Sequence, residues 1–64
     1  MKVFHNGEEM EVPEGMNVFD FTRKIGYRRV MVKVNGEQVM ASKFKETILK
    51  DGDEIMAKRI SGGG

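Results

Sequence analysis

The sequence predicts an α+β fold in which one small β-sheet packs against a single helix. Two Asn-Gly dipeptides, at residues 6–7 and 35–36, each separate two short runs with strand-like alternation, which is the strongest short-range signal for a β-hairpin. Between these hairpins, residues 17–26 carry apolar side chains at helical spacing and end on a glycine. Because the chain has only 64 residues, we expect one domain over residues 1–60 and a flexible tail over residues 61–64.

The first hairpin is expected within the first twelve residues. Met1–His5 has the composition of a strand, and Glu8–Val12 is the returning strand, with Met10 and Val12 on one face and glutamates on the other. Pro13-Glu14-Gly15 ends this strand, since proline has no amide hydrogen to donate to a ladder and glycine favours a turn.

One short amphipathic helix is expected next. Asn17 is a good N-cap, and Asp20 lies in the first turn, where a carboxylate interacts favourably with the helix dipole. Gly26 is expected to end the helix, because glycine adopts the left-handed conformation of a C-cap at little cost. The apolar face would consist of Val18, Phe21 and Ile25.

The second hairpin is expected around Asn35-Gly36. In its first strand, residues 29–35, three valines face one side, and Met31 and Lys33 face the other. A short returning strand follows through Gln38–Met40.

The last part of the chain is expected to cross over to a final strand. Residues 41–49 show no clear period, whereas Asp51-Gly52-Asp53 is a turn and Glu54–Ile60 alternates as a strand. The apolar side chains expected to fill the edge of the core from the irregular segment are Phe44, Ile48 and Leu49. The rest of the predicted core consists of Val3, Val12, Val18, Phe21, Ile25, Val30, Val32, Val34, Ile55 and Ala57.

The chain ends on Ser61-Gly62-Gly63-Gly64. Glycines are narrow enough to thread a channel that other residues would block, and the only reactive group there is the α-carboxylate of Gly64. The tail could therefore carry its terminal carboxylate into the active site of another protein while the folded domain is bound outside that site. A frayed terminus or a leftover linker would give the same residues.

Taken in order, these pieces resemble the ubiquitin-like β-grasp sulfur carriers, and most of all the ThiS group within the ThiS/MoaD family. The matching segments are Val3–Gly7 with Glu8, Val12–Gly15, Val34–Val39, Lys50–Asp53 and Gly62–Gly64. The resemblance implies a mixed sheet of four to five strands packed on one helix. It covers the length of the chain, although this tail has three glycines where the family motif needs two.

The resemblance also implies a function, that of a protein co-substrate with no catalytic residues and no bound cofactor. A ThiF-like adenylating enzyme would use MgATP to activate the C-terminal carboxylate of Gly64, with Gly63 as its neighbour; if the last residue is removed, Gly63 carries the chemistry instead. A persulfide on a partner protein would then supply sulfur, leaving a thiocarboxylate for a ThiG-like thiazole synthase in thiamine biosynthesis. A carrier for tRNA thiolation or molybdopterin synthesis, or a protein modifier, would share the fold and the tail.

The resemblance and the strand alternation together predict a partner-binding surface on the open face of the sheet. Phe4, Met31, Met56 and Ile60 are expected to form an apolar strip there that leads towards the tail. Such contiguous apolar patches usually mark partner surfaces, and methionine adapts to more than one partner. A shift of one residue in the strand phase would turn every one of these side chains over.

Composition argues against other classes of function. The chain has no cysteine, which excludes disulfides and thiolate metal sites and is compatible with a cytoplasmic setting; we expect no metal site and no membrane segment. The net charge of +1 gives little support to a nucleic-acid-binding module, the weaker alternative. His5 and the glutamates Glu8, Glu9 and Glu11 are expected to be structural or solvated residues. The basic groups Arg23-Lys24 and Arg28-Arg29 complement the helix C-terminus or steer an acidic partner.

Overall fold

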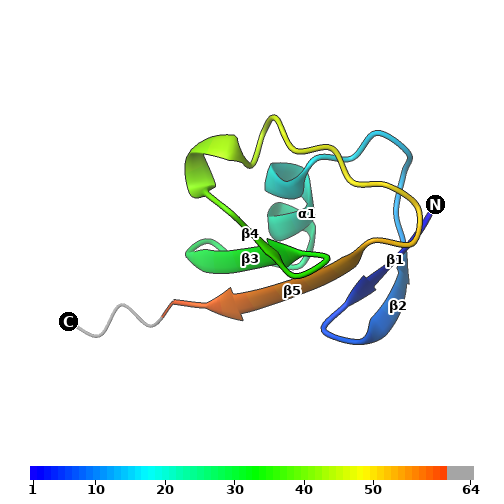
Figure 1. The fold of residues 1–64 in the computed structure, drawn as a ribbon, viewed down its shortest axis with the longest axis horizontal. Helices are drawn as coiled ribbons and strands as arrows, with labels where there is room; N and C mark the ends of the chain where they lie inside the picture. The colour runs from blue at the N-terminus through cyan, green and yellow to red at the C-terminus, as the bar shows by residue number, and fades with distance from the viewer. Residues whose placement is uncertain (61–64) are drawn as a thin grey trace.

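The computed structural model describes residues 1–60, and these form a five-stranded sheet with one α-helix (Figure 1). The strands are β1 (Lys2–His5), β2 (Glu8–Glu11), β3 (Val30–Val34), β4 (Glu37–Val39) and β5 (Glu54–Arg59). The helix α1 spans Val18–Lys24, and a short 3-10 helix, η1, spans Ala41–Lys43.

The last strand of the chain lies at the centre of the sheet, in the order β2-β1-β5-β3-β4. β5 pairs in parallel with β1 and antiparallel with β3, so it joins the two hairpins into one mixed sheet. In Figure 1, α1 lies over one face of this sheet, and the segment that leads from η1 to β5 crosses on the same side. The mixed sheet and single helix confirm the predicted fold class.

Both predicted Asn-Gly turns are present, and all four of their residues have positive φ, from 49° at Asn6 to 88° at Gly7. These are the angles that a tight primed hairpin turn requires. The asparagine side chains also bind the central strand. The Asn6 amide donates to the Ala57 carbonyl oxygen (3.2 Å) and accepts from the Ala57 N–H (3.0 Å). On the other side of β5, Asn35 Oδ1 accepts from the Glu54 N–H (3.0 Å).

Replacing Asn6 should therefore weaken the sheet at its centre as well as the turn. We expect Asn6→Gly to lower the free energy of unfolding by about 1–2 kcal/mol, because both backbone groups of Ala57 lose a partner. Asn6→Ala should cost about 1 kcal/mol more, since alanine tolerates positive φ poorly. Urea titrations measure both values, with the exposed Gln38→Ala as a control. Equal stability of Asn6→Gly and the parent protein would contradict this assignment.

The ends of α1 form as predicted. The Asp20 N–H donates to Asn17 Oδ1 (2.7 Å), which confirms Asn17 as the N-cap. Gly26 has a φ of 82°, and the Tyr27 N–H donates to the Thr22 carbonyl (2.9 Å) while the Gly26 N–H donates to the Arg23 carbonyl (3.1 Å). This pair of bonds is a Schellman motif, which ends the helix and turns the chain towards β3.

The core lies between α1 and the sheet and agrees closely with the prediction. Its buried members are Val3, Val12, Val18, Phe21, Val30, Val32, Phe44, Leu49, Ile55 and Ala57. Ile25 and Val34 are half-buried and pack against this cluster. The helix therefore covers the odd-numbered residues of β1 and β5 and leaves the other face of the sheet uncovered.

The prediction for Ile48 was wrong, because this side chain is 50% exposed. The chain around it is extended: the Val18 N–H donates to the Thr47 carbonyl (2.9 Å), and the Leu49 N–H donates to the Met16 carbonyl (2.8 Å). Successive side chains of an extended segment point in opposite directions. Leu49 therefore points into the core and Ile48 points to solvent.

Candidate functional site

The four residues predicted to form an apolar strip do share the open face of the sheet. β5 presents its even-numbered residues on this face, and Met56 is 60% exposed there. Met31 on β3 is 41% exposed, and Ile60, just after β5, is 53% exposed. Phe4 on β1 is half-buried. The predicted strand phase is therefore correct.

The register of the strands joins these side chains into a diagonal row. Phe4 pairs with Glu54 on β5. Met56 follows two residues later on the same face of the sheet, so Met56 is a diagonal neighbour of Phe4. Met31 pairs with Lys58 and therefore lies diagonally between Met56 and Ile60. Diagonal neighbours on one face of a sheet lie close enough for long side chains to touch. We call the row Phe4, Met56, Met31 and Ile60 the open-face strip.

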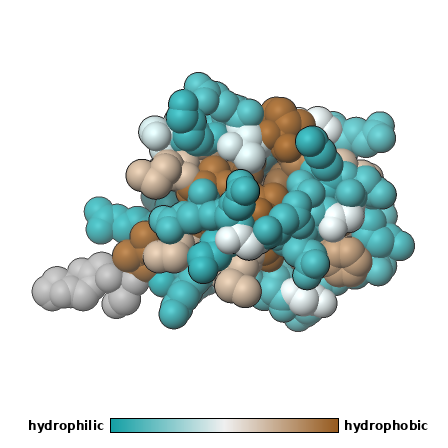
Figure 2. Space-filling view, viewed as in Figure 1, coloured by the Kyte–Doolittle hydropathy of each residue, from teal (hydrophilic) through white to brown (hydrophobic). Residues whose placement is uncertain are grey.

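Basic side chains flank the open-face strip. Lys33 lies opposite Met56, and Lys58 lies opposite Met31. A shallow hollow of about 620 Å³ opens on this face near Phe4, Met56 and both lysines, with an Asn-Gly turn at each side. In Figure 2 the hydrophobic surface near the end of β5 contrasts with the hydrophilic side chains around it. Glu54, opposite Phe4, lines the same hollow, so the site combines adaptable apolar contact with two lysines and one carboxylate.

Sequence reasoning missed one residue that extends the strip. Met40 is 63% exposed and follows β4 in an extended conformation. In the second hairpin Val32 pairs with Val39, and the same register continued by one position brings Met40 beside Met31. The two-residue turn at Asn35-Gly36 sets this register, so counting outward from the turn would have found it.

The strip runs along β5 towards the predicted reactive tail. The Ile60 N–H donates to the Arg29 carbonyl (3.1 Å), so the chain is held beside β3 as far as residue 60. The predicted tail residues Ser61, Gly62, Gly63 and Gly64 lie outside the described residues. Their role remains a prediction from the sequence.

His5 is half-buried and packs edge-on against two aromatic rings. Its ring centroid lies 5.6 Å from that of Phe21 and 6.1 Å from that of Tyr27. Its Nε2 is buried and has no hydrogen-bond partner among residues 1–60. His5 thus faces the helix side of the sheet, away from the open-face strip.

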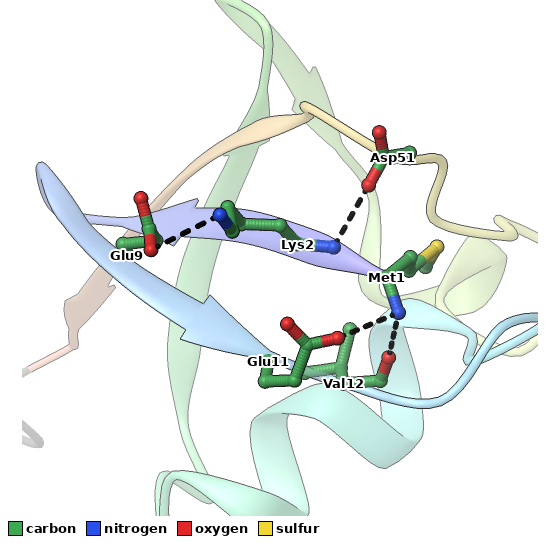
Figure 3. A network of polar contacts seen from close by, with 6 residues as sticks. All are labelled: Met1, Lys2, Glu9, Glu11, Val12 and Asp51. Atoms are coloured by element: carbon green, nitrogen blue, oxygen red, sulfur yellow. Dashed lines mark hydrogen bonds and ion pairs between the residues drawn. The ribbon is translucent and has the colours of Figure 1, made fainter.

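The glutamates of the first hairpin contribute to a structural network near the N-terminus (Figure 3). The Met1 ammonium donates to the Val12 carbonyl (2.7 Å) and pairs with Glu11 (3.0 Å), while Lys2 Nζ pairs with Glu9 (3.4 Å). The Lys2 N–H donates to Asp51 Oδ1 (2.8 Å) on the turn before β5. The Lys2–Glu9 pair is exposed at both ends and contributes about 0–1 kcal/mol. Together these contacts tie β1 to its neighbours.

The buried carboxylate of Asp53 also has structural partners. Its oxygens accept from the Asn35 side-chain amide (2.9 Å) and from the Lys50 N–H (2.8 Å). Over residues 1–60, no three His, Cys, Asp or Glu side chains gather as a metal ion would require. Neither helix in the same range is long and apolar enough to cross a membrane.

The comparisons with known proteins agree on one family. The model of the ThiS family matches residues 2–57 of this chain. The crystal structure of the thiamine biosynthesis protein (ThiS) from Geobacter metallireducens has a TM-score of 0.84 and 30% sequence identity, with 100% of both chains covered. An NMR solution structure of a thiamine biosynthesis protein from the same organism has a TM-score of 0.82 and 30% identity, covering 100% of this chain and 88% of that chain. A comparison with curated proteins found no significant match.

Proposed function

Because this chain belongs to the ThiS family, we propose that it is a sulfur carrier protein of thiamine biosynthesis. The observation that carries the proposal is the match over the full length of both chains to a ThiS protein at 30% identity. The sequence adds a C-terminus of three glycines, which suits a carrier whose end must enter the active site of another protein.

The chemistry would take place at the carboxylate of Gly64. In the partner adenylating enzyme, a ThiF-like protein, a carboxylate oxygen attacks the α-phosphorus of MgATP and pyrophosphate leaves. The resulting acyl-adenylate is electrophilic at its carbonyl carbon, since AMP is a good leaving group. The terminal sulfur of a persulfide on a donor protein attacks this carbon and displaces AMP. A thiol then attacks the donor-side sulfur of the acyl disulfide. This leaves the thiocarboxylate on Gly64 and a disulfide between the thiol and the donor protein.

On this proposal the carrier supplies a docking surface and a reactive C-terminus, and its partner enzymes supply the catalytic groups. The open-face strip gives the adenylating enzyme an apolar surface with Lys33 and Lys58 at its sides. A thiazole synthase that receives the sulfur would use an overlapping surface, because the same end must enter its active site. Exposed methionines, which adapt to different shapes, suit successive docking to two proteins.

The proposal is tested by incubating the protein with a ThiF-type enzyme, MgATP and a persulfide donor, followed by intact-mass spectrometry. We expect an ATP-dependent mass increase that corresponds to replacement of one oxygen by sulfur. No change, with an enzyme that is active on another ThiS protein, would overturn the proposal.

A second step assigns the pathway. The thiocarboxylate form is offered to a thiazole synthase and, separately, to a molybdopterin synthase subunit and a tRNA-thiolating enzyme. Sulfur transfer to the thiazole synthase alone is the expected result. Transfer only to one of the other acceptors would retain the carrier chemistry and contradict the thiamine assignment.

A further inference from the structure

A second candidate binding surface lies on the helix side of the molecule, between α1 and η1. It is a groove of about 280 Å³, lined by Phe19, Thr22, Arg23, Tyr27, Arg28, Ala41 and Phe44. In Figure 1, η1 lies on the same side of the sheet as α1, so this groove and the open-face strip are on opposite sides of the sheet. We call it the cation–aromatic groove.

Cationic groups lie over two half-buried aromatic rings that line the groove, those of Phe19 and Tyr27. Arg23 Cζ and Lys45 Nζ each lie 4.8 Å from the centroid of the Phe19 ring. Arg59 Cζ lies 4.6 Å from the centroid of the Tyr27 ring. These distances are within the range of attractive cation–π contacts. Such contacts hold the charged groups in place, and less side-chain entropy is then lost when a ligand binds.

The positive charge of this region is not neutralised within the described part of the chain. Arg23, Arg28 and Lys45 form no ion pair with a carboxylate there, and the ion pairs that include a side-chain cation involve only Lys2 and Lys43. The chain also separates its charges: residues 21–36 contain five Lys and Arg and no acid, whereas residues 3–22 contain five acids and no Lys or Arg. A net charge of +1 therefore conceals a basic region around the helix C-terminus.

We propose that the cation–aromatic groove binds an acidic peptide segment of a partner protein. A guanidinium group that stacks on a ring still presents its N–H edge, and this planar fork matches a carboxylate with two parallel hydrogen bonds. Nucleic-acid bases would instead need open aromatic faces for stacking. Here Arg23 and Lys45 already lie over Phe19, and Arg59 lies over Tyr27. Charge complementarity therefore favours carboxylates. The proposal is independent of sulfur transfer.

The test uses the intact protein and a short polyglutamate peptide, with backbone amide NMR shifts as the readout. Shifts are expected to centre on the groove and to be absent with a polyglutamine peptide. The double substitution Arg23→Glu with Lys45→Glu should weaken binding by about tenfold, because it reverses the two charges that lie over the Phe19 ring of the groove. The matched control is Lys2→Glu with Lys50→Glu, which makes the same change in net charge at exposed lysines outside the groove and outside the hollow on the open face.

Loss of affinity in the groove variant, with near-parent affinity in the control, would support the proposal. Equal losses in both variants would mean that the peptide responds only to net charge, and the proposal would fail. A polyuridine RNA that binds the same residues more tightly than the peptide would overturn it in favour of nucleic acid. None of these measurements needs an adenylating enzyme, so their outcome is separate from that of the proposed function.

Discussion

A variant that lacks Gly63 and Gly64 should gain no sulfur when it is incubated with the adenylating enzyme, MgATP and a persulfide donor. Shortening the tail by two residues withdraws its terminal carboxylate by roughly 7 Å, more than an active site that must position this carboxylate can tolerate. Intact-mass spectrometry should show the unmodified mass at times when the full chain has reacted. The core spans Val3 to Ala57, so we expect the variant to fold like the parent protein.

The matched control lacks Gly64 alone. It still ends on two glycines, the number that the family motif needs, and it should accept sulfur on Gly63. Sulfur gain by the variant that lacks both Gly63 and Gly64 would show that the glycine tail is not the reactive end. Modification of a lysine side chain in place of the C-terminus would show the same. Circular dichroism spectra of both variants should match that of the full chain.

Met56→Asp should weaken the complex with the adenylating enzyme by about 2 kcal/mol, or roughly thirtyfold in Kd, if the open-face strip is the docking surface. Met56 lies at the centre of the strip and is 60% exposed. A carboxylate there would lose its hydration in the complex, and Lys33, which lies opposite on β3, would offset only part of that cost, whereas in the free protein the carboxylate would stay in water. The free energy of unfolding should therefore change by less than about 1 kcal/mol.

Ile48→Asp is the matched control for this substitution. Ile48 is an exposed apolar residue of similar size, but it lies next to the N-terminus of α1 and not on the open face of the sheet. Titration calorimetry should give the parent Kd for this variant. Equal binding by Met56→Asp and Ile48→Asp, or unfolding of the Met56 variant, would remove the strip as a docking surface.

The local features of the fold could be predicted from the sequence because each depends on residues close together in the chain. Asn-Gly at positions 6–7 and 35–36 has the backbone freedom of a tight turn, and both turns have the expected positive φ. Asn17 and Gly26 begin and end the helix through bonds that span a few residues. The alternation of the strands assigned the open-face strip correctly, since the period of a strand allows only two faces.

Contacts between segments far apart in the chain could not be predicted in this way. The Ile48 prediction failed because residues 47–49 become extended only by pairing with the chain before α1. The bonds from Asn6 to Ala57 also exist only because β5 lies beside the first hairpin.

The same limit applies to the cation–aromatic groove. Arg23, four residues after Phe19, could be expected near that ring, but Lys45 and Arg59 reach Phe19 and Tyr27 only through the packing of distant segments. By itself, then, the sequence determined the turns, the helix ends, the two faces of each strand and the resemblance to a family. The tertiary structure decided which residues meet across the sheet and where charge gathers, because these depend on strand order and register, which no short stretch of residues encodes alone.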